Sequence, residues 1–361
     1  MKILHIAPIG KNAEGIGTVL SKLVPEQKAL GVEVKAISCL DGAIKNEIIS
    51  EVITMKKPFR EFVNNWRPDV VLFHSLFEMP CIMMAKVLLE LGIPYAIQMH
   101  GAMSIANYRK GRLKKWIANK LWFDSFVRKA KALVFLNEAE HENCLSTKIN
   151  SSYAILPNGC EQKLDSYIQH EIKDPVNIVY IGRIAFNHKG LDMLIESLRL
   201  LQKTGRNDFY LSIYGNEKDP DVEKLKQSLA DLQEIASYKG GVYGDEKDKV
   251  FKEADAFILT SRYEGMPMGV LEALAYGVPC ILTPGTNMAD DVVEAGAGWK
   301  GEFSAESIAD TIVVAIEDLH REYSMYNQFA FNLSKRYDWN VIAKKSIELL
   351  SEFIQYGYDK V

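Results

Sequence analysis

The sequence predicts an α/β protein built from two doubly wound parallel sheets. Short apolar segments with the length of buried strands alternate with longer segments that can form helices, which is typical of βαβ units. The 361 residues are enough for two domains with complete cores. The composition, 48% hydrophobic and 25% charged, is ordinary for a globular protein.

The strand candidates follow one another through both halves of the chain. In the first half they are 2–7, 33–37, 70–73, 95–99, 132–136 and 153–156; in the second half they are 176–181, 209–214, 256–259 and 280–282. The polar stretch between Pro157-Asn158-Gly159 and Pro175 is the expected linker, and Asn158-Gly159 predicts a turn with positive φ. A last helix is expected over 339–356.

Composition excludes several classes of protein. No run approaches the 18 apolar residues of a membrane-spanning helix, and the first residues form a strand candidate too short for a signal-peptide core. The five cysteines are widely spaced and lack a C-x-x-C pattern, so neither a disulfide framework nor a zinc site is expected. We therefore expect a cytoplasmic protein without a metal or a cofactor.

The richest motif runs from Ser261 to Ala273. It follows the strand candidate 256–259 and contains Glu264 and Glu272 on either side of a glycine-containing loop. Such a loop, opening a helix, brings backbone N–H groups to one point and suits a diphosphate. Carboxylates accept hydrogen bonds from sugar hydroxyl groups. Phosphate between two sets of hydroxyls describes a nucleotide-sugar.

This E-x7-E pattern, with the following Glu272-Ala273-Leu274-Ala275-Tyr276-Gly277-Val278-Pro279, resembles the donor site of retaining glycosyltransferases of the GT-B fold. More narrowly, it resembles family 4, the glycosyl transferases group 1. The resemblance implies two Rossmann-like doubly wound domains facing across a cleft. It implies that Glu272 binds the ribose and Glu264 the transferred sugar, with the N–H groups of Met268, Gly269 and Val270 near the diphosphate.

Two cations flank another strand–helix loop. Ile181-Gly182-Arg183 ends one strand candidate, and Lys189-Gly190 opens a helix with apolar residues at a 3.6 period. Paired cations can neutralise a diphosphate, and arginine can hold two oxygens at once. The arrangement resembles the Arg and Lys of the family's donor site. The motif assigns no role to His188 between them.

Three residues of the first half are further candidates. Gly15 and Gly17 follow the first strand, but Leu20 stands where a dinucleotide-binding G-x-G-x-x-G needs its third glycine, which disfavours an NAD site. His100 ends a parallel strand, where ligands of open α/β sheets bind. By resemblance, Gly15 and Gly17 lie near the donor phosphate or the acceptor, and His100 lies near the donor sugar.

Charged residues are distributed unevenly along the chain. Residues 1–160 carry 21 Lys and Arg against 14 Asp and Glu, and residues 161–361 carry 22 against 33. The segment 109–131 concentrates nine basic residues and four aromatic ones. Such a segment either binds an anionic membrane surface or packs as an ordinary surface helix. A nucleic-acid partner is not expected, because no RNA-binding motif accompanies the charge.

The resemblance implies a retaining, metal-independent glycosyltransferase that uses a UDP- or GDP-linked sugar and a saccharide or lipid-linked acceptor, in bacterial surface polysaccharide or glycolipid synthesis. The expected domains are an acceptor-side domain (1–165), a nucleotide-sugar domain (166–338) and a C-terminal helix (339–361), which the resemblance places back on the first domain. A nucleotide-sugar epimerase on the same fold and a non-catalytic nucleotide-sugar-binding subunit are the alternatives.

Overall fold

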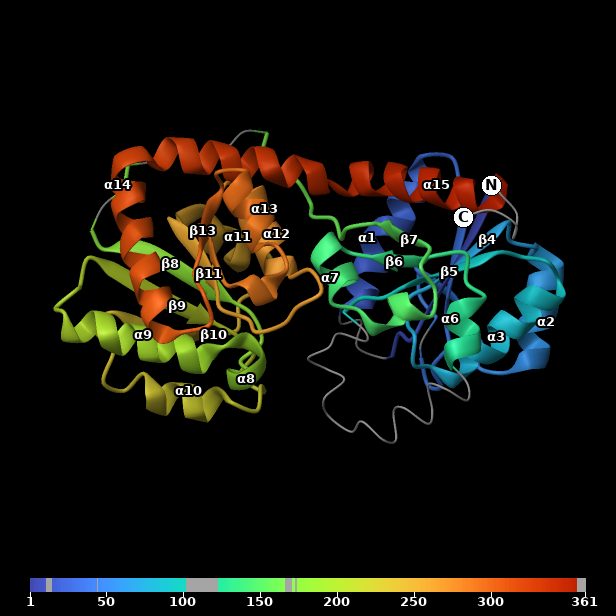
Figure 1. Ribbon diagram of the computed structural model, residues 1–361, viewed down its shortest axis with the longest axis horizontal. Helices are drawn as coiled ribbons and strands as arrows, with labels where there is room; N and C mark the ends of the chain where they lie inside the picture. Colours follow the sequence, from blue (N-terminus) through green and yellow to red (C-terminus); the bar gives the residue numbers. More distant parts are fainter. Residues whose placement is uncertain (11–14, 44, 102–122, 166–170, 173, 356–361) are drawn as a thin grey trace. The chain divides into compact units, whose positions relative to one another are not determined.

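The computed structural model describes residues 1–10, 15–43, 45–101, 123–165, 171–172 and 174–355, and the chain forms two compact units (Figure 1). Unit 1 consists of Met1–Gly159 together with Trp339–Val361, and unit 2 consists of Cys160–Asp338. The first boundary therefore follows Gly159, whereas we expected it after residue 165. The last helix is grouped with unit 1.

Unit 1 is built on a seven-stranded parallel sheet with the order β3-β2-β1-β4-β5-β6-β7. The order reverses between β1 and β4, which creates a switch point there. Its strands are β1 (Lys2–Ala7), β2 (Glu33–Ser38), β3 (Ile49–Val52), β4 (Val70–Phe73), β5 (Tyr95–Gln98), β6 (Leu133–Phe135) and β7 (Tyr153–Ile155). β4 and β5 are buried along their whole length, as strands covered on both faces should be.

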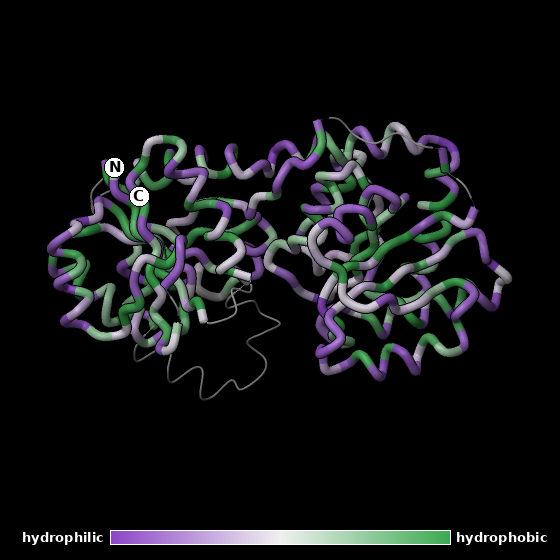
Figure 2. The backbone as a smooth tube through the Cα atoms, turned by 180° about the vertical axis from the view of Figure 1, so that it is seen from behind, coloured by the Kyte–Doolittle hydropathy of each residue, from purple (hydrophilic) through white to green (hydrophobic). Residues whose placement is uncertain are grey.

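Helices cover the sheet of unit 1. They are α1 (Ile16–Ala29), α2 (Lys56–Trp66), α3 (Met79–Glu90), α6 (Asp124–Arg128), α7 (Glu138–Glu142), the 3₁₀ turn η2 (Leu145–Lys148) and α15 (Trp339–Gln355). Figure 2 shows hydrophobic residues along the inner strands and hydrophilic residues along the outer helices. A continuous core of apolar side chains, with Phe59, Phe73 and Tyr95 fully buried, joins α2, α3 and the sheet.

The first residue of helix α15, Trp339, packs against Gly159 within unit 1. The Trp339 ring lies so close to Gly159 that a Cβ there would be 2.4 Å from it. Gly159 has no positive φ, and neither Asn158 nor Gly159 lies in a turn, so the predicted Asn158-Gly159 turn is wrong. This glycine provides room for Trp339 instead. The Gln27 side chain of α1 donates a hydrogen bond to the Ser346 hydroxyl of α15 (2.9 Å).

Unit 2 is built on a six-stranded parallel sheet with the order β10-β9-β8-β11-β12-β13. Its switch point lies between β8 and β11. The strands are β8 (Val176–Ile181), β9 (Phe209–Tyr214), β10 (Ala236–Gly240), β11 (Ala256–Leu259), β12 (Cys280–Leu282) and β13 (Gly298–Lys300). The helices are α8 (Phe186–Lys189), α9 (Leu191–Lys203), α10 (Val222–Ser228), α11 (Gly244–Glu253), α12 (Met268–Ala275), α13 (Ala289–Glu294) and α14 (Ala305–Ser334), with 3₁₀ turns η3 (Pro284–Thr286) and η4 (Lys335–Tyr337).

Candidate functional site

The switch point of unit 2 gathers the charged residues that the sequence singled out. Arg183 lies in the loop after β8, Lys189 ends the short helix α8 that follows, and the loop after β11 carries Glu264. Since β8 and β11 are neighbouring parallel strands, their carboxyl ends lie at one edge of the sheet. Ligands of open α/β sheets bind at this place.

The two loops are held together through their backbones. Gly190 has φ 64°, and a Cβ there would lie 2.0 Å from the carbonyl oxygen of Thr260, so only glycine fits. The Thr260 hydroxyl donates to the carbonyl of Lys189 (3.0 Å), and the Arg262 amide donates to the carbonyl of His188 (2.9 Å). The side chains of both loops therefore start from a fixed frame.

Glu264 is the centre of the cluster. Its Oε1 lies 2.6 Å from the Lys189 ammonium and accepts a hydrogen bond from the Ser261 hydroxyl, also at 2.6 Å. The Asn287 amide donates to the Glu264 carbonyl (2.7 Å). The side chains of Lys189 and Glu264 are 13% and 12% exposed, so this ion pair is largely shielded from water. The carboxylate is thus oriented before any ligand arrives.

His188 holds Arg183. The His188 Nε2 lies 2.8 Å from the carbonyl oxygen of Tyr263, which can only accept, so Nε2 carries the proton. The Nδ1 then accepts from the Arg183 guanidinium at 2.8 Å. Burial lowers the pKa of His188, which favours this neutral form. The His188 ring also stacks on Tyr263 with centroids 4.3 Å apart.

The helix that follows the loop begins within the motif itself. α12 starts at Met268, with Pro267 as the preceding cap residue, so Met268 and Gly269 lie in the first turn, where N–H groups lack an intrahelical partner. The Val270 amide donates to the Pro267 carbonyl (3.1 Å). Of the three amides expected near a diphosphate, that of Val270 is therefore already used.

Glu272 lies in a different environment from Glu264. It stands one turn into α12, and its Oε2 is 2.6 Å from the ammonium of Lys247 on α11. Its side chain is 34% exposed. The two glutamates of the motif are thus each paired with a lysine from another loop or helix, and Glu272 is the more accessible to solvent.

The remaining candidates belong to unit 1. Gly15 has φ 59° and caps α1, and Gly17 is buried in the first turn of that helix, just beyond the carboxyl end of β1. His100 follows β5 with φ 46°, an unusual conformation for a residue with a side chain. Its Nε2 lies 3.0 Å from Nδ1 of His74, which follows β4.

Several polar residues of these edges were not predicted from the sequence. Ser261 lies inside the E-x7-E stretch, and its position beside a glutamate was a usable signal. Lys247 and Asn287 come from distant parts of unit 2, so no local pattern marks them. Glu140 of α7 is buried and accepts hydrogen bonds from the amides of Gly101 and Leu136; burial raises its pKa.

The basic segment 109–131 is only partly described. Residues 109–122, with Lys114 and Lys115, lie outside the described residues. In the described part, Phe123 and Phe126 are buried in the core of unit 1, whereas Arg128 and Lys129 are exposed. These two aromatic side chains therefore pack inward.

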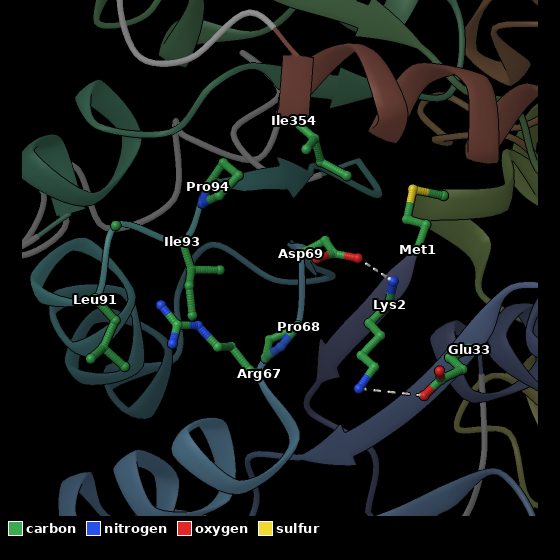
Figure 3. A pocket seen from close by; sticks show the side chains of 11 residues that line it. Met1, Lys2, Glu33, Arg67, Pro68, Asp69, Leu91, Ile93, Pro94 and Ile354 are labelled. Carbon is green, nitrogen blue, oxygen red and sulfur yellow. Dashed lines mark hydrogen bonds and ion pairs between the residues drawn. The ribbon is translucent and has the colours of Figure 1, made fainter.

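Figure 3 shows the side chains that line a cavity at the amino ends of the strands of unit 1. The volume of this cavity is about 580 Å³. Lys2, Glu33, Arg67 and Asp69 line it, at the amino ends of the strands. The Lys2 ammonium lies 3.7 Å from Glu33, and the Lys2 amide donates to Asp69 at 2.7 Å. None of the predicted site residues lines this cavity.

The described residues contain neither a membrane-spanning helix nor a cluster of metal ligands. No helix in the described ranges is both long enough and apolar enough to cross a membrane. Among the same residues, no group of three or more His, Cys, Asp or Glu side chains could hold a metal ion.

Comparisons with known proteins point to one family. The profile of the glycosyl transferases group 1 matches residues 163–336. An N,N'-diacetylbacillosaminyl-diphospho-undecaprenol alpha-1,3-N-acetylgalactosaminyltransferase from Campylobacter jejuni is 26% identical over 282 residues, which cover 73% of this chain and 72% of that protein.

Solved structures agree on the fold. The lipopolysaccharide outer core galactosyltransferase WaaB superposes with a TM-score of 0.74 at 17% identity, over 98% of this chain and 99% of that one. Anabaena HepE in complex with UDP-glucose gives the same TM-score and identity, over 98% and 100%. The predicted α/β class with two Rossmann-like units is confirmed, and so is the predicted resemblance to the group 1 glycosyltransferases of the GT-B fold, whose profile matches residues 163–336 of this chain.

Proposed function

We propose that this glycosyltransferase is retaining and metal-independent, and that it moves a sugar from a UDP- or GDP-linked donor to a hydroxyl of a saccharide or lipid-linked acceptor. The observation that carries the proposal is the Lys189–Glu264–Ser261 cluster at the switch point of unit 2. It supplies a cation for phosphate and a carboxylate for hydroxyls at one point of the sheet edge.

Unit 2 is the proposed donor domain. The Lys189 ammonium and the Arg183 guanidinium, which His188 orients, are suited to the diphosphate. The amides of Met268 and Gly269 add the positive end of a helix. These groups stabilise the charge that develops on the leaving diphosphate, which is the work that a metal ion does in metal-dependent transferases.

Glu264 is proposed to bind the hydroxyls of the transferred sugar. Its contacts with Lys189 and Ser261 both use Oε1, so they fix the plane of the carboxylate while Oε2 can accept from a sugar hydroxyl. The more exposed Glu272 is proposed to bind the two ribose hydroxyls. Lys247 then holds the Glu272 carboxylate in place.

Transfer with retention needs no dedicated base in this scheme. The acceptor oxygen bonds to the anomeric carbon on the face from which the diphosphate leaves. The bond from that carbon to the phosphate oxygen breaks, and the acceptor proton passes to the leaving phosphate. Glu264, paired with Lys189, stays an electrostatic partner of the positively charged sugar.

Unit 1 is the proposed acceptor side, with Gly15, Gly17 and His100 at its carboxyl edge. The Campylobacter relative is named for a diphospho-undecaprenol substrate, and WaaB for lipopolysaccharide outer core. We extend this to bacterial surface polysaccharide or glycolipid synthesis, in the cytoplasm or at the inner face of the membrane.

A thermal-shift screen of UDP, GDP and their sugars tests the donor assignment, because a ligand that binds the native state raises the melting temperature. Glu272→Gln should abolish the shift, and Glu253→Gln, whose exposed carboxylate pairs with Lys249, should not change it. With the donor known, NMR of the product gives the anomeric configuration. An inverted product, or a donor epimerised without an acceptor, contradicts the proposal.

A further inference from the structure

A row of polar side chains crosses unit 1 from helix α15 to the end of β5. The Gln27 amide nitrogen donates to Ser346 (2.9 Å), and its oxygen lies 2.9 Å from His5 Nε2. His5 Nδ1 lies 2.8 Å from His74 Nε2, and His74 Nδ1 lies 3.0 Å from His100 Nε2. Four of the five side chains are fully buried, and His100 at the end is partly exposed.

One hydroxyl group determines which group donates and which accepts in each hydrogen bond of this row. Ser346 donates its single proton to the carbonyl of Ala343 in the same helix (2.7 Å), and a carbonyl can only accept. The Ser346 oxygen must therefore accept from Gln27, which turns the Gln27 carbonyl toward His5. If the row ran the other way, the Ser346 proton would be turned to Gln27 and its bond to Ala343 would be lost.

The tautomer of each histidine ring then determines the tautomer of the next one. His5 donates its Nε2 proton to Gln27, so its Nδ1 accepts from His74. His74 donates from Nε2, so its Nδ1 accepts from His100, which carries its proton on Nε2 as well. Burial lowers the pKa of His5 to about 4 and holds the pKa of His74 well below its usual value, so both rings are neutral. The Nδ1 of His100 is left with a lone pair.

The backbone at His100 is held as firmly as the ring. His100 has φ 46° and is followed by Gly101 with φ 78°, a left-handed pair that strains a residue with a Cβ. The buried carboxylate of Glu140 accepts from the Gly101 amide and from the Leu136 amide. Such strain is maintained where the surroundings fix a side chain in one position.

We propose that Ser346, Gln27, His5 and His74 form a relay that fixes His100 in the Nε2–H tautomer, so that its Nδ1 accepts a hydrogen bond from a sugar hydroxyl. The identity of the ligand rests on the proposed function; the relay does not. Gln27, His5 and His74 act through His100 and are positioning residues. The relay makes helix α15, at the far end of the sequence, part of the site in unit 1.

Nitrogen-15 NMR of histidine-labelled protein tests the relay directly, with the signal of His100 assigned from His100→Asn. The expected spectrum has His5, His74 and His100 neutral, each protonated at Nε2. Ser346→Ala removes the group that sets the direction and should give a mixture of tautomers at His100. Ser351→Ala removes a hydroxyl with the same kind of bond to its own helix and should change nothing. An Nδ1–H tautomer at His100 in the native protein overturns the relay.

Kinetics then test the ligand. Gln27→Leu and Ser346→Ala should lower kcat about five- to tenfold, since about one hydrogen bond to the sugar is weakened, while binding of the free nucleotide stays unchanged. If the tautomers are as expected but kcat is unchanged, the sugar contact is wrong and the relay stands. If the tautomers differ while transfer proceeds, the relay is wrong and the transferase assignment stands.

Discussion

Replacing Lys189 by Met tests the proposed donor site and its internal energetics together. Methionine keeps the length and the apolar stem of the side chain but removes the ammonium group. Two effects follow, because this ammonium is paired with Glu264 in the free protein and is proposed to face the diphosphate during transfer. The effects fall on different measurements, so they can be separated.

The stability effect comes from the ion pair. The Lys189 and Glu264 atoms are 2.6 Å apart, and both side chains are about seven-eighths shielded from water. Removing one partner of a fully buried pair costs about 3–5 kcal/mol. The partial exposure and the Ser261 hydroxyl, which still donates to Glu264, reduce the expected cost to about 2 kcal/mol.

The catalytic effect comes from the leaving group. Removing one preorganised donor to developing negative charge lowers kcat by about 10²–10³. Because the charge grows as the diphosphate leaves, kcat should fall more than donor binding weakens. Steady-state kinetics with the identified donor and urea unfolding of the same preparations give the two numbers.

A double-mutant cycle with Glu264→Gln isolates the pair. The double variant should be less destabilised than the sum of the two single variants, with a coupling of about 1–2 kcal/mol. Lys249→Met is the matched control, since Lys249 and Glu253 are 74% and 62% exposed and 3.8 Å apart, and its cost should be near zero. Additive losses at Lys189 and Glu264, or full activity of Lys189→Met, refute the reasoning.

Four further predictions follow from the same structure. Glu272→Ala should raise KM with little change in kcat, and Glu264→Ala should mainly lower kcat, because the sugar gains charge in the transition state whereas the ribose does not; the reverse split contradicts the two assignments. Activity should survive excess EDTA, and loss that Mn²⁺ restores contradicts metal independence. Burial holds the pKa of His5 below its unfolded value near 6.5. The neutral ring therefore contributes up to about 3 kcal/mol of stability above pH 6.5, and this contribution is lost as the pH falls toward 4. The urea midpoint of unfolding should drop over this interval, and it should drop less in His5→Gln. Anionic liposomes should bind the protein through 109–131 at low salt and release it as salt rises; no binding at low salt identifies an ordinary packed segment.

The central strands could be predicted from the sequence because they are buried on both faces. Segments such as 70–73 and 256–259 are continuous apolar runs, and the structure has β4 and β11 over these residues. The three strands that the sequence analysis did not predict, β3, β10 and β13, are all edge strands. β10, with the sequence Ala-Ser-Tyr-Lys-Gly, carries too few apolar residues to be distinguished from a loop.

The candidate site was predictable as a set of motifs but not as a set of contacts. Arg183, Lys189 and Glu264 were found because strand ends mark the edge of a sheet. Their partners were not, since the pairing of Lys189 with Glu264 depends on β8 lying next to β11, which no local pattern records. The histidine row is hidden for the same reason: His5 and His74 are brought together only by the pairing of β1 with β4.

The polar groups at the two switch points differ in charge and in burial. In unit 2 the polar groups are charged, and they remain partly exposed because a buried ion loses more hydration than its partner restores. In unit 1 the row of side chains is neutral, so four of its five members can be buried completely as long as their hydrogen bonds are satisfied. A partly exposed charged cluster can therefore take a further partner from solvent, as Lys189 is proposed to do when a diphosphate binds beside Glu264. A buried neutral row cannot exchange partners without leaving a donor or acceptor unpaired, which makes it suited to holding one side chain, His100, in a single state.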